Sequence, residues 1–157
     1  MINDYLYNLG QLFENVSKEN GSRLALKYIS EKSVNYQELN LISNRIANYL
    51  LENNIGKNNV VAILNNKTAI SYSIMLACLK IGVVYTNLDP KSPLERFNKM
   101  IFICDPKIIF YYEDKHSVIN QFKSKKIKLI DYSHGQFLNS ISNSEEFPII
   151  NSKCYIG

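Results

Sequence analysis

The residues that could take part in chemistry are few, and they are scattered along the chain. The only histidines are His116 and His134, and neither lies in an HExxH metal motif or near a GxSxG nucleophile motif. A catalytic triad that uses either histidine stays open as an alternative. Asp89 follows an expected strand, where catalytic carboxylates occur, but an aspartate directly before Pro90 is also typical of a turn. We interpret Asp89 as a turn residue.

The sequence offers no loop of the usual phosphate-binding types. Its six glycines are dispersed, and neither the P-loop pattern nor GxGxxG is present. The stretch Asn65-Asn66-Lys67-Thr68 follows an expected strand, and backbone amides at the start of the next helix could hold an anion beside Lys67. A helix cap at Thr68 explains the same residues. We therefore expect a cap, and nucleotide binding near Lys67 is kept as an alternative.

Metal, disulfide and nucleic-acid chemistry find little support. Cys78, Cys104 and Cys154 are far apart and form no CxxC pair, so we interpret them as small core residues. The net charge is +4, and the only local basic cluster runs from Lys123 to Lys128. No nucleic-acid-reading motif accompanies this cluster, which we interpret as a solvated loop.

Nothing in the sequence indicates a membrane protein. No apolar run reaches the roughly 20 residues that a membrane-spanning helix needs. The first residues do not have the basic and apolar segments of a secretory signal. We expect a cytoplasmic protein with no membrane or nucleic-acid partner.

Apolar periodicity predicts helices and strands that alternate along the chain. The first helix carries the stripe Leu9, Leu12, Phe13 and Val16 and ends near Gly21. The other predicted helices are 37–52, 69–81, 93–104, a short one around 118–122 and one near residue 136. The predicted strands are 24–29 and 34–36, which form a hairpin around a turn at 30–33, then 60–64, 83–86, 108–112, 127–130 and 154–156.

Three helix ends carry specific signals. Thr68 is expected to cap the helix 69–81, and Gly82 is expected to end it in the left-handed conformation. Ser92-Pro93-Leu94-Glu95 has the form of a capping box with proline at the first helical position. We therefore expect Ser92 to cap the helix that stops before Asp105-Pro106.

Alternating strands and helices imply right-handed crossovers and a parallel sheet. The predicted fold class is α/β, a doubly wound and mostly parallel sheet flanked by helices, with a small N-terminal hairpin. The length of 157 residues suits a single domain, 1–157.

Three stretches resemble the AMP-binding, adenylate-forming enzyme family. Val34–Asn40 with Ser43–Ala47 resembles the "(L/V)(T/S)YxELNxxSNRxAxxL" segment of nonribosomal peptide synthetase adenylation domains. Leu79–Pro90 resembles the "LKAGxAYVPLDP" motif, and Ser92–Arg96 resembles the "(Y/S)PxxR" that follows it. Leu12-Phe13-Glu14 also fits the first helix of that family.

The resemblance implies that residues 1–157 are the N-terminal subdomain of an adenylation domain. In the family, a strand like Lys153–Ile156 leads into "TSGSTGxPKG", the loop that holds the ATP phosphates, and this chain stops at Gly157. The resemblance therefore implies no catalytic, cofactor-binding or metal-binding residue on this chain. ATP and Mg²⁺ are implied for the complete enzyme. The implied partners are the rest of the adenylation domain and a carrier protein or small accessory protein.

The family reaction joins a carboxylate to ATP, which gives an acyl-adenylate and pyrophosphate, and a phosphopantetheine thiol then takes the acyl group. Asn87 stands where the family usually has proline, and Ile81, Val83 and Val84 are bulkier than the family's small residues. These departures leave both amino-acid adenylation and acyl-CoA synthesis open. We expect the chain to be inactive alone, and a non-catalytic scaffold or interaction module is kept as an alternative.

Overall fold

The computed structural model of the chain describes residues 8–29, 32–112, 119, 121–122, 126–133 and 135–146. Its centre is a parallel four-stranded sheet in the order β4-β3-β5-β6. The strands are β3 (Val60–Leu64), β4 (Val84–Leu88), β5 (Ile108–Tyr111) and β6 (Lys128–Asp131). A separate antiparallel pair joins β1 (Leu24–Leu26) to β2 (Val34–Asn35).

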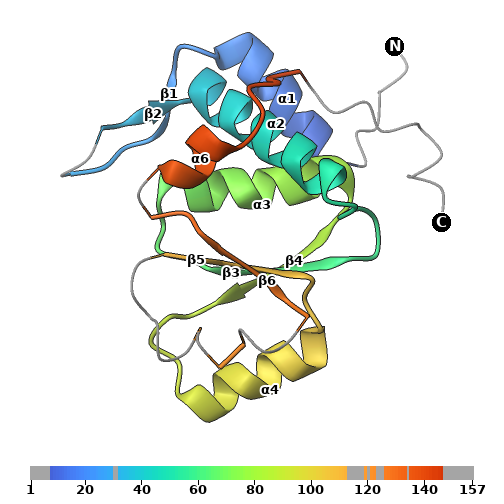
Figure 1. Cartoon of the computed structure of the whole chain (residues 1–157). Coiled ribbons are helices and arrows are strands. Elements are labelled where there is room, and N and C mark those ends of the chain that lie inside the picture. The colour runs from blue at the N-terminus through green and yellow to red at the C-terminus, as the bar shows by residue number, and fades with distance from the viewer. Residues whose placement is uncertain are drawn as a thin grey trace.

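Helices cover both faces of the sheet (Figure 1). One face carries α1 (Leu9–Asn20), α2 (Tyr36–Glu52), α3 (Ala69–Ile81) and the short α6 (Gln136–Ser140), and the other carries α4 (Leu94–Cys104). The chain passes from β3 through α3 to β4, and then through α4 across β3 to β5. This path is the doubly wound topology that alternating strands and helices predict, so the predicted fold class is confirmed, hairpin included.

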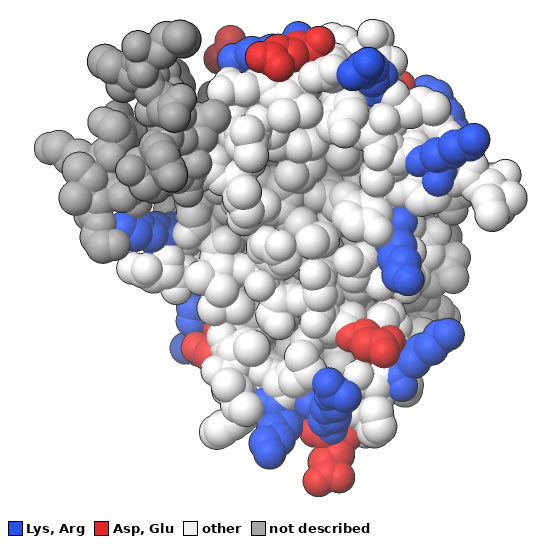
Figure 2. Space-filling view, turned by 180° about the vertical axis from the view of Figure 1, so that it is seen from behind, with Lys and Arg blue, Asp and Glu red and all other residues white. Residues whose placement is uncertain are grey.

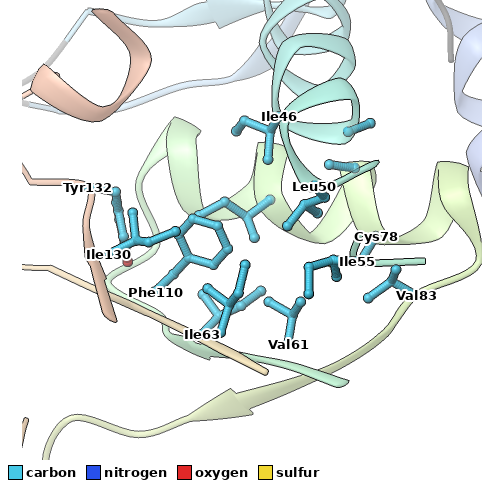
Figure 3. Packing of buried hydrophobic residues seen from close by; sticks show 14 of the residues in the cluster. Ile46, Leu50, Ile55, Val61, Ile63, Cys78, Val83, Phe110, Ile130 and Tyr132 are labelled. Carbon is cyan, nitrogen blue, oxygen red and sulfur yellow. The ribbon is translucent and has the colours of Figure 1, made fainter. Parts of the chain in front are cut away.

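Alternate residues of each central strand face the two helical layers, and both layers are apolar. Toward α2 and α3 the sheet presents Val61, Ile63 and Phe110, which pack against Ile46 and Leu50 of α2 (Figure 3). Toward α4 the sheet presents another apolar set, which encloses Phe97 and Ile101 of that helix: Ala62, Leu64, Leu88 and Ile109. Burial on both faces explains why β3 is a continuous apolar run.

Most predicted boundaries agree with the structure within two residues. Thr68 accepts a hydrogen bond from the amide of Ser71, and Gly82 ends α3 with a φ of 68°, as predicted. β1 is three residues shorter than expected because the pair is antiparallel and its partner β2 begins only at Val34, opposite Leu26, so the residues after Leu26 have no partner strand.

Two sequence expectations are wrong. Pro93, with a ψ of 144°, is itself the N-cap of α4, and no side chain caps that helix, so Ser92 forms no capping box. In α1 only half of the stripe faces the protein: Phe13 and Val16 are partly buried and Leu9 and Leu12 are exposed, whereas Gly10 and Ser17 are buried. The reason is a close approach to α3, because a Cβ added at Gly10 would lie 2.7 Å from the backbone of Lys80.

Other expectations fall outside the described residues. The strand 154–156 lies entirely outside them, and so do His116, His134 and Cys154. Residues 118 and 120 of the predicted helix around 118–122 also lie outside, whereas Ile119 and Phe122 are described and are buried against α4.

Candidate functional site

A hollow of about 770 Å³ lies at the carboxyl ends of β3 and β4. The loop after β3 turns to α3 on one face of the sheet, and the loop after β4 turns to α4 on the other. Two adjacent loops that diverge in this way form the switch point where open α/β sheets bind ligands. The residues that line the hollow are Asn65, Asn66, Lys67, Asn87, Leu88, Asp89, Pro90 and Lys91.

The backbone amides of the loop after β3 donate hydrogen bonds to other groups of the protein. The amide of Asn65 donates to Leu88 O, that of Asn66 to the Tyr132 hydroxyl, and that of Lys67 to the Asn65 side chain, with N–O distances of 3.3, 3.4 and 2.7 Å. The amides expected to offer an anion site are therefore engaged up to Lys67, and Thr68 acts as the helix cap that we favoured.

The loop after β4 is a turn organised by Asp89. Its carboxylate accepts from the amide of Lys91 at 2.8 Å, and its carbonyl accepts from the amide of Ser92 at 3.0 Å. This confirms the interpretation of Asp89 as a turn residue. Asn87, near the end of β4, accepts from the side-chain amide of Asn65 at 3.3 Å, so the loop after β3 is tied to β4.

The chemistry of this hollow is that of a polar binding surface. Lys67 and Lys91 supply positive charge and the asparagines supply amides, but none of the eight residues that line the hollow is a histidine, cysteine or serine nucleophile. Among the residues that the structure describes, no three His, Cys, Asp or Glu side chains gather to hold a metal ion. The described residues therefore offer no carboxylate group of the kind that holds Mg²⁺.

A second charged feature lies at the amino ends of β5 and β6, where Lys107, Lys126 and Lys128 line a hollow of about 300 Å³. Lys107 is paired with Asp105 at 3.4 Å, and Lys128 donates to Asn53 at 2.6 Å and covers the ring of Tyr49. On the face seen in Figure 2 the Lys and Arg side chains are scattered rather than gathered. Lys126 and Lys128 are exposed, but Lys128 begins β6 and residues 123–125 lie outside the described part of the chain, so a solvated loop at 123–128 stays a prediction.

The least expected polar feature is Lys80, whose side chain is completely buried beneath α1 and α2. Its ammonium nitrogen lies 2.5 Å from the side-chain oxygens of both Asn40 and Asn44, and 3.5 Å from the carboxylate of Glu14. Burial lowers the pKa of Lys80 from 10.5 to about 8, and the Glu14 carboxylate opposes that shift. We name this group, Glu14, Asn40, Asn44 and Lys80, the buried lysine cluster.

The sequence model of the AMP-binding enzyme family matches residues 13–149. The chain belongs to the AMP-binding enzyme family.

This member of the AMP-binding family is similar to one part of much larger proteins. The hybrid PKS-NRPS synthetase gkaA of Penicillium citrinum is 30% identical over 138 residues, which cover 88% of this chain and 3% of that protein.

Solved structures show the same fold. The N-terminal domain of FACL13 from Mycobacterium tuberculosis superposes with a TM-score of 0.82 at 17% identity, covering 93% of this chain and 39% of that one. An artificially fused adenylation-PCP di-domain, NpsA-ThdA of Klebsiella oxytoca, gives a TM-score of 0.75 at 21% identity and covers 92% and 26% of the two chains. The fold is thus that of a part of the N-terminal subdomains of adenylate-forming enzymes.

The stretches that carry the AMP-binding resemblance meet at the buried lysine cluster. Glu14 comes from the first helix, Asn40 and Asn44 come from the "ELNxxSN" stretch, and Lys80 comes from the "LKxG" stretch. Phe13 also lies with its ring centroid 5.9 Å from the Lys80 nitrogen. In this member of the AMP-binding family the motif residues therefore hold three helices together.

From the sequence, these residues were identified only as parts of the family motifs, and their contact with one another was not predicted. The signal that could have found the cluster is the only charged residue of a mostly apolar helix, Lys80, together with two asparagines at i and i+4 of another helix. A buried ammonium needs such oxygens, because leaving it unpaired in an apolar core is costly.

Proposed function

We propose that this chain forms the first part of the N-terminal subdomain of an adenylation domain in an ATP-dependent acid–thiol ligase of the nonribosomal peptide synthetase type. In this proposal residues 1–157 are one incomplete unit, inactive alone, and the complete enzyme uses ATP and Mg²⁺. The reaction is that of the family: a carboxylate and ATP give an acyl-adenylate, whose acyl group then passes to phosphopantetheine.

The observation that carries the proposal is the family match over residues 13–149, joined to the burial of the motif residues in one cluster. The 30% sequence identity with gkaA supports the nonribosomal peptide synthetase type over an acyl-CoA synthetase. The similarity to FACL13, at 17% identity, rests on the fold alone.

The role of the chain's own residues in this proposal is structural. The sheet and its helices provide a rigid layer against which the rest of the domain can hold its substrates, and rigid support keeps reacting groups aligned. No proton transfer is assigned to a residue described here. The hollow between the loops after β3 and β4 is a polar surface formed by Lys67, Lys91 and asparagines, and we assign it no chemical step.

Two partners belong to the proposal. One is the remainder of the adenylation domain, since the chain covers 39% of the FACL13 N-terminal domain that it superposes on. The other is a carrier protein, which the likeness to an adenylation-PCP fusion supports. A cytoplasmic location suits both partners. No helix among the described residues is long and apolar enough to cross a bilayer.

The test is ATP–pyrophosphate exchange with a panel of amino and aryl acids. We expect no exchange by the chain alone. We expect exchange when the chain replaces the matching segment of an adenylation domain from a curated relative. The matched control is that relative's domain with the segment deleted, which should be inactive.

Two results would contradict the proposal. The first is acid-dependent exchange by this polypeptide unaided. The second is a chimera that is folded, as shown by a cooperative unfolding transition, yet exchanges with no acid. In that case capture of a carrier protein without exchange would favour the interaction module.

A further inference from the structure

The segment that follows α6 is held to helix α2 by side chains of α2. Asn44 donates to Glu145 O at 2.8 Å, and Asn48 donates to both Ser144 O and Glu146 O at 3.1 Å. Arg45 donates to Leu138 O at 2.5 Å and to Ser142 O at 3.3 Å. Each of these four residues of the segment and Leu138 is bound through its backbone carbonyl, although Asn48 also donates to the Ser144 hydroxyl at 3.3 Å, so the contacts fix the path of the backbone.

Residues 142–145 have no regular secondary structure, and their side chains are exposed. Such a segment has few apolar contacts of its own, so its order depends on these donors. Figure 1 shows it running beside α2, on the side of the molecule away from α4. We name Asn44, Arg45 and Asn48 the α2 clamp.

Asn44 belongs both to the clamp and to the buried lysine cluster. Its side-chain oxygen accepts from Lys80 at 2.5 Å while its side-chain nitrogen donates to Glu145 O. An amide has its oxygen and nitrogen on opposite sides, so the ammonium can bind only the oxygen and leaves the nitrogen toward residue 145. If the amide turned over, two donors would meet at Lys80 and two acceptors at Glu145.

We propose that Lys80 is a positioning residue, which fixes the orientation of the Asn44 amide and thereby locks residues 142–146 onto helix α2. The coupling runs from α3 through α2 to the segment beyond α6, and Glu14 extends it to α1. These contacts are between residues of this chain alone and are independent of the proposed ligase activity.

The structure supplies a matched pair of variants for the test. Asn44→Asp keeps an oxygen for Lys80 but replaces the donor to Glu145 O by a second oxygen. Asn40→Asp makes the same chemical change beside the same ammonium, and its hydrogen bonds recorded in the structure do not reach residues 142–146. The two variants therefore differ in the clamp and are matched in the added charge.

The measurement is the ¹⁵N heteronuclear NOE of residues 142–146, together with the rate of proteolytic cleavage there and the urea midpoint of global unfolding. We expect Asn44→Asp to lower the NOE and raise cleavage about tenfold, because a buried hydrogen bond is lost. Asn40→Asp should leave both unchanged. Asn48→Asp, which lacks a contact with Lys80, should release the segment as a positive control.

Lys80→Met tests the positioning step, since it removes the group that orients Asn44. We expect a folded protein whose residues 142–146 show the lowered NOE of Asn44→Asp. An unchanged segment in folded Lys80→Met overturns the proposal. If Lys80→Met does not fold, the Asn44→Asp and Asn40→Asp pair decides, and equal NOE and cleavage in those two variants overturns it.

Discussion

At the scale of single residues, the buried lysine cluster shows how a polar group can define a core. Lys80 is fully buried and has oxygens of Asn40, Asn44 and Glu14 around its nitrogen. A buried charge contributes little net stability but is costly to leave unpaired. The cluster therefore favours one arrangement of α1, α2 and α3 over any other that would separate Lys80 from these oxygens.

The lowered pKa of Lys80 predicts a pH dependence of stability. Below pH 8 both folded and unfolded chains carry the proton, whereas above pH 8 the folded chain loses it and the unfolded chain, with a pKa of 10.5, keeps it. The free energy of unfolding should therefore rise with pH, by at most about 1.4 kcal/mol per pH unit. Burial raises the pKa of Cys78 from 9.0 to about 12 and that of Tyr132 from 10.0 to about 12, so these groups act in the opposite direction above about pH 9.

The clear window for this effect is pH 8 to 9. Urea unfolding at pH 7, 8 and 9 should show the rise in wild type and lose it in Lys80→Met. If the free energy of unfolding rose equally in wild type and in Lys80→Met, other groups would cause the pH dependence and the prediction would be wrong.

Gly10 gives a second residue-scale prediction, because α1 and α3 approach so closely there. A methyl group at Gly10 would lie 2.7 Å from the Lys80 backbone, which cannot move aside like the end of a side chain. Gly10→Ala should destabilise the protein by about 1–3 kcal/mol, despite alanine's higher helix propensity. Chemical denaturation measures this.

The matched control for this prediction is Gly56→Ala, since a Cβ at Gly56 meets nothing within 4 Å. That variant should be neutral or stabilising by up to about 1 kcal/mol, through the unfolded chain. Equal effects at the two glycines would show that the close helix approach is not what requires Gly10.

At the scale of elements, the sequence predicts a helix or strand correctly where the signal depends only on neighbouring residues. The apolar run Val60–Leu64 predicted a strand buried on both faces, and Gly82 predicted a left-handed helix end. The buried lysine cluster could not be predicted in this way, because it depends on which faces of three helices meet. The stripe of α1 fails for the same reason: Gly10 makes the close approach to α3, whereas Leu9 and Leu12 of the stripe are exposed.

The helix caps give an element-scale prediction in which sequence and structure disagree. Asn35 accepts from the amide of Glu38 at 2.7 Å, and Glu38 accepts from the amide of Asn35 at 3.0 Å, which is a complete capping box. Asn35→Ala should therefore cost about 1 kcal/mol of stability. Ser92→Ala, at the position that the sequence pattern favoured, should be nearly neutral because no side chain caps α4. Thermal unfolding of the two variants decides, and a larger loss from Ser92→Ala would contradict the structure.

At the scale of the whole molecule, the two faces of the sheet are covered unequally. Four described helices lie on the β1–β2 side, but α4 is the main cover of the other (Figure 1). Phe102 and Ile103 of α4 are 83% and 69% exposed, and Leu94 and Val84 beside the same face are half exposed. Solvent-exposed apolar groups of this size favour association.

The exposed residues of α4 predict self-association of the isolated chain. Each buried apolar side chain contributes about 1.5–3 kcal/mol relative to its exposed state, so two large side chains from each copy can hold a weak dimer. Multi-angle light scattering over a range of concentrations should show an average mass that rises with concentration. The double variant Phe102→Gln with Ile103→Gln should remain monomeric. Ile29→Gln, which changes an exposed isoleucine of the β1–β2 connection, should behave like wild type because β1 and β2 lie on the side of the sheet away from α4 (Figure 1). A wild-type chain that stays monomeric at every concentration would contradict the prediction. Association that persists in the double variant would show that the chain associates through a surface other than α4.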